Sequence, residues 1–276
     1  MKRIFYALAL ILVSALAASC EQEQGTMPGN DSAAGFAVFT FAPDAPYVSD
    51  NDLRVKICPN NKVTDVYYVA EPKDKAGTDD AYIDHVISAG THLSVQGDVE
   101  QVVTGMMGDY VISFVAVDAS GNRKLVQKDF TGIIWEDVVT GTYSFKNANI
   151  QKYIGGATAK VLLQKSSNVA NLYRVKDLYG KGYSLKFTLV PDIDTSDSEG
   201  PAVACTVAPQ KTGFTFTYKG EDQPIQVRDV ATWQNNEDYL SSMYFYTQDN
   251  HFYLWVQYYI AAGNLGYGYD SFSPDE

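Results

Sequence analysis

Residues 241–260, SSMYFYTQDNHFYLWVQYYI, decide the kind of fold that this chain adopts. Two types of side chain alternate along two runs, and this two-residue period is that of half-buried β-strands. The polar segment 247–250, TQDN, separates the runs and predicts a four-residue hairpin loop. That loop places Phe245 opposite Phe252, so both rings belong to one apolar face. We therefore expect an antiparallel hairpin with one apolar face and one mixed face.

The mixed face of this hairpin carries the most informative chemistry in the sequence. Met243, Leu254 and Val256 extend the apolar face. The mixed face consists of Tyr244, Tyr246, His251, Tyr253, Trp255, Gln257 and Tyr259. Aromatic rings stack on the C–H groups of sugars and amides bond to sugar hydroxyl groups, so this face suits a carbohydrate. Cross-strand tyrosines also stabilise sheets, and the same face can instead pack inside a barrel. A slip of one residue would exchange the two faces.

A second aromatic candidate lies just before the hairpin, in the segment ATWQNNEDY. Trp233 is followed there by amides, of which Asn235 is one, and by Tyr239. A tryptophan in a polar loop is a common sugar platform, and it can equally close the end of a sandwich. Because 14 of the 20 tyrosines and all three tryptophans lie at or beyond residue 135, we expect any ligand site in the second half of the chain.

Residues 135–276 predict a C-terminal all-β domain. The expected strands are 141–145, 159–163, 172–175, 185–189, 203–207, 214–218, 225–230, 242–246 and 252–260. No stretch keeps a 3.6-residue period, which indicates few helices. A curved β-sandwich or a partly closed β-barrel fits this pattern. The glycine-rich segment 263–268 is interpreted as a turn.

Residues 35–134 predict a separate β-sandwich. Short strands are expected at 36–41, 53–57, 66–70, 110–118 and 125–126, separated by turn signals. A short helix is expected at 80–88.

The first 34 residues have the composition of a targeting segment and a linker. Lys2 and Arg3 precede an apolar run of about 13 residues, and small residues lead into Cys20. This is the pattern of a secretory signal over residues 1–19, and the run is too short to span a membrane. The polar residues after Cys20, up to 34, predict a flexible linker.

Composition and motifs exclude several classes of function. A formal charge of −12 disfavours nucleic acid and anionic membrane surfaces as partners. Three scattered cysteines and three isolated histidines predict neither a disulfide framework nor a zinc site. No P-loop, dinucleotide fingerprint or nucleophile elbow is present, so we expect no enzyme and no cofactor.

One acidic loop is a weak calcium candidate. It contains Asp192, Asp194, Asp197 and Glu199. Carboxylates are the ligands that calcium prefers, but the loop lacks the glycine and the final glutamate of an EF-hand. A solvated loop is the favoured interpretation.

Several motifs resemble those of surface lipoproteins of the Bacteroidetes. The segment LAASC that ends at Cys20 resembles a lipobox, which implies acylation of that cysteine. GDYVISFVAVDASGN, residues 108–122, resembles the penultimate hairpin of immunoglobulin-like and fibronectin-like modules, with Tyr110 as the corner tyrosine. IIWEDVVTGTYSF, residues 133–145, resembles the junction to the C-terminal β-domain of these lipoproteins.

This resemblance implies a protein that is tethered by lipid to the bacterial outer membrane and faces the cell surface. It further implies similarity to the accessory lipoproteins of starch-utilisation-like systems, with an outer-membrane transporter complex as partner. We expect a non-catalytic, glycan-binding protein. A structural or adhesive protein-interaction module with buried aromatics is the alternative, and a glycan hydrolase ranks third.

Overall fold

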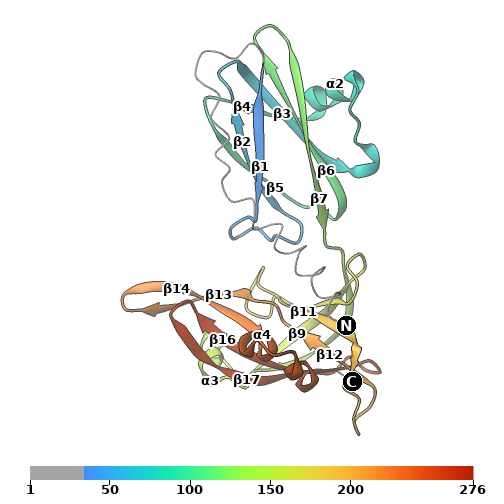
Figure 1. Cartoon of the computed structure of the whole chain (residues 1–276), viewed down its shortest axis with the longest axis vertical. Coiled ribbons are helices and arrows are strands. Elements are labelled where there is room, and N and C mark those ends of the chain that lie inside the picture. The colour runs from blue at the N-terminus through green and yellow to red at the C-terminus, as the bar shows by residue number, and fades with distance from the viewer. Residues whose placement is uncertain (1–33, 276) are drawn as a thin grey trace. The chain divides into compact units, whose positions relative to one another are not determined.

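The computed structural model describes residues 34–275, which divide into two units (Figure 1). Within the described part, the first unit comprises residues 34–41, 54–103 and 111–130, and the second comprises 42–53, 104–110 and 131–275. Strands dominate both units, as the sequence predicts. Cys20, the expected signal peptide and the expected linker up to residue 33 lie outside the described residues.

The first unit contains a three-stranded and a four-stranded sheet. The strand order is β1-β2-β5 in one sheet and β4-β3-β6-β7 in the other. The strands are β1 (Phe36–Phe41), β2 (Leu53–Pro59), β3 (Val63–Pro72), β4 (Thr91–Ser94), β5 (Val99–Val103), β6 (Gly108–Asp118) and β7 (Arg123–Gly132). A 3-10 turn, η1 (Lys73–Lys75), and the helix α2 (Asp80–Ala89) connect β3 to β4. The predicted helix at 80–88 is therefore confirmed.

Strand β6 is the centre of the first unit because it is buried on both faces. Its residues from Val111 to Ala116 are all buried, which explains why this stretch is apolar except for Ser113. Tyr82 and Val86 of α2 pack with Val115 on one of these faces, so the helix covers the four-stranded sheet (Figure 1).

Of two predictions for the β6–β7 hairpin, the structure confirms the turn but gives no support to the corner tyrosine. The turn after β6 is confirmed, since the Asp118 carboxylate accepts hydrogen bonds from the backbone of Ser120 and Asn122. Tyr110, expected as a corner tyrosine, has no hydroxyl hydrogen bond to any residue of the range 34–275.

In the second unit, eight antiparallel strands form a closed barrel (Figure 1). The ring order is β8-β9-β10-β11-β12-β15-β16-β17, and β17 pairs back onto β8. These strands are β8 (Trp135–Ser144), β9 (Thr158–Ser166), β10 (Leu172–Lys176), β11 (Leu185–Asp194), β12 (Ala202–Thr206), β15 (Tyr244–Tyr246), β16 (Phe252–Ile260) and β17 (Gly263–Pro274). A further hairpin, β13 (Gln210–Tyr218) and β14 (Glu221–Asp229), pairs with β16 outside the ring. The short helices are α3 (Ala148–Ile154), α4 (Val230–Gln234) and η2 (Glu237–Ser242).

Strand β17 closes the barrel, and the interpretation of its first half as a turn was wrong. It pairs with β16 on one side and with β8 on the other. Glycines lower the strand propensity of this segment, but Gly268 is required there. A Cβ at Gly268 would lie 2.9 Å from both the backbone nitrogen of Asn147 and the Asp270 carboxylate.

The predicted hairpin register is confirmed. Tyr244 pairs with Tyr253, and Phe245 pairs with Phe252. The apolar face points into the barrel, where Phe245, Phe252, Leu254 and Val256 are buried. Further aromatic side chains, among them Tyr143, Phe145, Phe187, Tyr258 and Phe272, join this core. Large side chains thus fill the barrel.

Asp270 of β17 is a carboxylate inside this core. It is 0% exposed, and its oxygens accept hydrogen bonds from the Tyr258 hydroxyl at 2.9 Å and from the Lys146 backbone at 2.7 Å. The Tyr143 hydroxyl donates a third bond at 3.2 Å. Burial raises the pKa of Asp270 to about 6, although these hydrogen bonds act in the opposite direction.

Asp270 therefore predicts a specific pH dependence of stability. The folded state keeps the proton up to about pH 6, whereas the unfolded chain releases it near pH 4, so this group destabilises the fold as pH rises between these values. The variant Asp270→Asn cannot titrate. We expect its unfolding free energy, relative to that of the parent protein, to rise by roughly 3 kcal/mol between about pH 4 and about pH 7. Urea unfolding across this range measures the difference.

Asp98→Asn is the matched control for this series. A hydrogen bond from Lys56 lowers the pKa of Asp98, so that group titrates below about pH 4 in both states. Its effect on stability should change little between about pH 5 and about pH 7. A pH-independent difference for Asp270→Asn would contradict the assignment of a raised pKa to this carboxyl group.

Candidate functional site

Because side chains fill the barrel, the candidate site lies on its outer surface. Six aromatic side chains cluster there, and we call this cluster the aromatic face. It consists of Trp233, Tyr239, Tyr253, Trp255, Tyr267 and Tyr269.

Strands β16 and β17 supply four of these rings through simple alternation. On β16, Leu254 and Val256 point into the barrel, and Trp255 between them points outward. On β17, Tyr267 and Tyr269 flank the buried Gly268 in the same way. Trp255 is directly opposite Tyr269 in the ladder, and the ring of Tyr253 stacks on that of Tyr269 at 5.8 Å.

Helix α4 positions Trp233, and a buried aspartate holds the helix. Asp229 is 0% exposed and caps α4, since its carboxylate accepts from the backbone of Thr232 at 2.6 Å. Its other oxygen accepts from the Thr206 hydroxyl at 2.8 Å, which ties the helix to β12. The Trp233 ring consequently stacks on Tyr267, with 5.7 Å between ring centres.

The 3-10 turn η2 supplies the sixth ring. Leu240 is buried in the core and anchors the turn. Tyr239 beside it meets Trp255 edge-on, at 5.8 Å and an angle of 89°. Tyr267 meets Trp255 at 6.4 Å and 64°. Trp255 therefore contacts two rings that stand steeply to its plane.

An open depression of about 530 Å³ lies over this part of the aromatic face. Its lining consists of Lys146, Ser242, Trp255, Tyr267, Gly268 and Tyr269. No carboxylate or histidine belongs to this lining. The lining therefore presents aromatic ring faces, one ammonium group and hydroxyl groups to a ligand.

The exposure of these rings shows which are accessible. Tyr267 is 57% exposed and Tyr269 is 39% exposed, while Tyr253 and Trp255 are half-buried. The Tyr269 hydroxyl donates to the backbone carbonyl of Ser242 at 2.8 Å. Burial raises the pKa of both Tyr253 and Tyr269, so their hydroxyl groups stay neutral at physiological pH.

The structure places three of the expected site residues in packing roles. Tyr246 is only 3% exposed, and its hydroxyl donates to Asp197 at 2.8 Å. Gln257 is 2% exposed and accepts a hydrogen bond from Arg228 at 2.8 Å. Tyr259 lies under the same guanidinium group, 4.4 Å from its ring centre. These contacts bury Tyr246 and Gln257, whereas Tyr259 stays half-buried under the guanidinium group.

Two further expected residues lie beside the aromatic face rather than in it. Tyr244 is half-buried, stacks on Tyr246 at 6.3 Å, and borders the face because it pairs with Tyr253. Asn235 is exposed and ends α4 in a left-handed conformation with φ of 50°. Its position is that of a helix cap.

Most carboxylates of the acidic loop form hydrogen bonds or ion pairs with other groups of the protein. Asp194 accepts from the backbone and hydroxyl of Ser196, and these bonds lower the pKa of Asp194. Asp197 accepts from Tyr246 and from the backbone of Glu199, whose own carboxylate pairs with His251 at 3.4 Å. Asp192 is exposed. Among residues 34–275, no three acidic, histidine or cysteine side chains lie where they could hold a metal ion.

Sequence reasoning missed Tyr267 and Tyr269, which are the most exposed rings of the aromatic face. Their spacing, Tyr-Gly-Tyr, is the two-residue period of a strand and was a usable signal. The surrounding glycines favoured a turn instead, and the pairing of β17 with β8 depends on residues more than 120 positions away.

Comparisons with known proteins give no relative: no family model, curated protein or solved structure matches this chain. In the part of the chain that the structure describes, no helix has both the length and the apolar character needed to cross a membrane.

Burial predicts how two tyrosines of this region affect stability. Tyr267→Ala removes an exposed ring and should lower the unfolding free energy by less than about 1 kcal/mol. Tyr246→Ala leaves a cavity and removes the hydrogen bond to Asp197, and should lower it by about 3 kcal/mol. Urea unfolding at neutral pH measures both. Equal losses of unfolding free energy in the two variants would contradict the assignment of Tyr267 as exposed and Tyr246 as buried.

Proposed function

We propose that this protein binds a neutral glycan through the aromatic face and performs no catalysis. The observation that carries the proposal is the position of Trp255, with Tyr239 and Tyr267 standing at 89° and 64° to its plane beside an open depression. A sugar ring can stack its C–H groups on the indole and contact the tyrosines at its edges. Such flanking rings limit where a ring-shaped ligand can lie.

The lining of the depression favours this ligand class over two others. Glycoside hydrolysis requires a pair of carboxyl groups, and the lining contains none. Aromatic cages also bind quaternary ammonium groups, but the Lys146 ammonium would repel a cation. Lys146 and the Tyr267 hydroxyl group remain available as partners for sugar hydroxyl groups.

We further infer an immunoglobulin-like or fibronectin-like architecture for the first unit. Its first, second and fifth strands share one sheet, and its third, fourth, sixth and seventh strands share the other. This distribution of seven strands supports the inference. Such domains often act as spacers that carry a binding domain.

We also propose that Cys20 is acylated and tethers the protein to the bacterial outer membrane, facing the cell surface. The signal-like residues 1–19 and the segment LAASC support this cellular location. In that setting the protein would deliver glycans to an outer-membrane transporter complex, like the lipoproteins that its motifs resemble.

A protein-binding role is the second candidate function, and a different surface favours it. Strand β1 lies at the edge of its sheet, where Phe39 is 40% exposed and Phe41 is 43% exposed. Exposed apolar side chains on an edge strand are typical of surfaces that add a strand from a partner.

Isothermal titration against neutral oligosaccharides of glucose, xylose and mannose tests the glycan proposal. We expect at least one series to bind. Trp255→Ala should weaken that binding at least about tenfold, or ~1.4 kcal/mol, because it removes the stacking platform. Tyr267→Ala should weaken it less, since it removes only a flanking ring.

Tyr218→Ala is the matched control, because Tyr218 is 39% exposed on β13 and does not belong to the aromatic face. The affinity of the Tyr218→Ala variant for the glycan should equal that of the parent protein. Choline, as a cationic probe, should not bind. If no oligosaccharide binds, or if Trp255→Ala binds as tightly as the parent protein, the proposal is rejected.

A further inference from the structure

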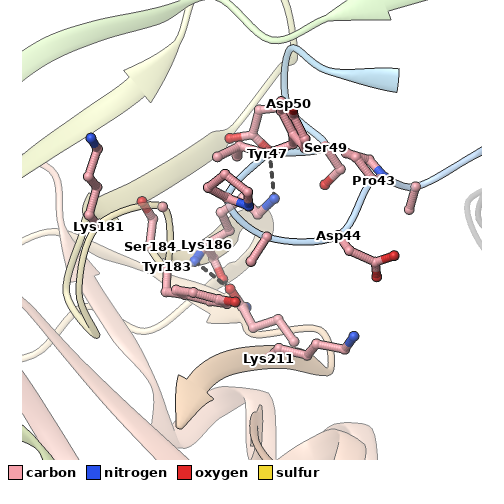
Figure 2. Close-up of a pocket in the computed structure, with 16 residues that line it drawn as sticks. Pro43, Asp44, Tyr47, Ser49, Asp50, Lys181, Tyr183, Ser184, Lys186 and Lys211 are labelled. Carbon is pink, nitrogen blue, oxygen red and sulfur yellow. Dashed lines mark hydrogen bonds and ion pairs between the residues drawn. The ribbon is translucent and has the colours of Figure 1, made fainter. Parts of the chain in front are cut away.

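The second unit has another pocket, of about 310 Å³, which shares no lining residue with the depression on the aromatic face (Figure 2). One wall is the loop 42–50. The other wall comprises the turn 181–184, Lys186 of β11, and Gln210 and Lys211 of β13. All of these residues belong to the second unit.

The buried carboxylate of Asp50 fixes the loop wall of this pocket. Asp50 is 3% exposed, and its oxygens receive the Lys186 ammonium at 2.7 Å and the Arg174 guanidinium at 3.1 Å. The Trp135 indole N–H donates to it as well, at 3.1 Å. Val48 of the loop is also held, because its backbone N–H donates to Asp52 at 2.8 Å. This wall is therefore formed before any ligand arrives.

The opposite wall is equally well ordered. Asp177 accepts from the backbone of Gly182 at 2.8 Å and so shapes the turn that carries Lys181. The Tyr183 ring lies against Gly213, where a Cβ would come within 2.6 Å of it. The Tyr183 hydroxyl has no hydrogen-bond partner among the described residues and stays available to a ligand.

Positive charge collects in this pocket, in a chain whose net charge is −12. Lys186 uses one of its three N–H donors on Asp50, which leaves two. Within residues 34–275, the ammonium groups of Lys181 and Lys211 have no hydrogen bond or ion pair. Figure 2 shows these two lysines on opposite sides of the pocket, with Lys186 between them.

The charge balance of the pocket is positive. Asp50 is already matched by Arg174 and Lys186, and Asp44 is the only other acidic residue of the lining. We propose that this pocket binds the oxyanion group of a small organic acid, such as a carboxylate or phosphate carried on a sugar. Lys186 donates charge-assisted hydrogen bonds to the anion, Lys181 and Lys211 attract it from the two sides of the pocket (Figure 2), and Tyr183 packs against the body of the ligand. The volume, near the lower end for ligand pockets, suits a ligand of this size.

Titration calorimetry on the whole chain tests this proposal with four probes. Glucuronate and glucose 6-phosphate carry the two kinds of oxyanion on one sugar body, glucose is the uncharged probe, and inorganic phosphate is the free anion. We expect one or both organic acids to bind more tightly than glucose and inorganic phosphate. Binding should weaken as salt increases, because the contacts are ionic.

Variants of the two unpaired lysines locate the site. Lys181→Gln and Lys211→Gln should each weaken binding of the organic acid about tenfold, and the double variant about a hundredfold. Lys186 is left in place because its removal would deprive Asp50 of a partner. The double variant Lys152→Gln/Lys176→Gln removes the same charge from exposed positions outside the pocket and should bind like the parent protein.

Three outcomes would overturn the proposal. They are the absence of binding by both organic acids, equal binding by inorganic phosphate, and unchanged affinity in the Lys181→Gln/Lys211→Gln variant. Trp255→Ala should leave binding of the organic acid unchanged. A failure of glycan binding at the aromatic face is thereby distinguishable from a failure of this proposal.

Discussion

The alternation of side chains along β16 and β17 is the constraint on which the second unit depends. One set of residues, including Phe252, Leu254 and Val256, fills the barrel. The other set, including Trp255 and Tyr267, is directed outward and forms the aromatic face. Since strand geometry couples the two sets, a shift by one residue would place the rings of the aromatic face inside and expose the core. The same packing that stabilises the barrel therefore determines where a ligand can bind.

Three buried aspartates attach peripheral segments to this barrel. Asp50 holds the loop 42–53, Asp229 holds the helix that carries Trp233, and Asp270 receives the backbone N–H of Lys146. Each accepts at least three hydrogen bonds or ion-pair contacts, which offsets the cost of burying a carboxylate. The loop 42–50 lines one pocket and Lys146 lines the depression on the aromatic face, to which α4 contributes Trp233 through its contact with Tyr267. Buried polar groups thus position the segments around the two candidate sites, whereas the apolar core stabilises the barrel.

Much of the barrel follows from local pattern, and the rest depends on contacts distant in sequence. The bounds of β16 and the pairing of Phe245 with Phe252 could be predicted, because alternation and a polar loop are local signals. The role of β17 as a strand could not be predicted, because its glycines favour a turn. Only the close approach of Asn147 to Gly268, which is visible in the structure, explains why a glycine is needed there. Likewise, Tyr246 and Gln257 have the right residue types and the right face for a site. Asp197 and Arg228, on other elements, remove them from the surface.

The indole N–H signals of the three tryptophans give the most direct test of the aromatic face as a glycan site. In a ¹H–¹⁵N spectrum, Trp233 and Trp255 report on this face. The N–H of Trp135 is bonded to Asp50 and serves as an internal reference. On titration with the oligosaccharide that binds most tightly, we expect saturable shifts of the Trp255 and Trp233 signals and an unchanged Trp135 signal. Binding that leaves the Trp255 signal unchanged, or that shifts all three signals equally, would contradict the proposal of a glycan site on this face.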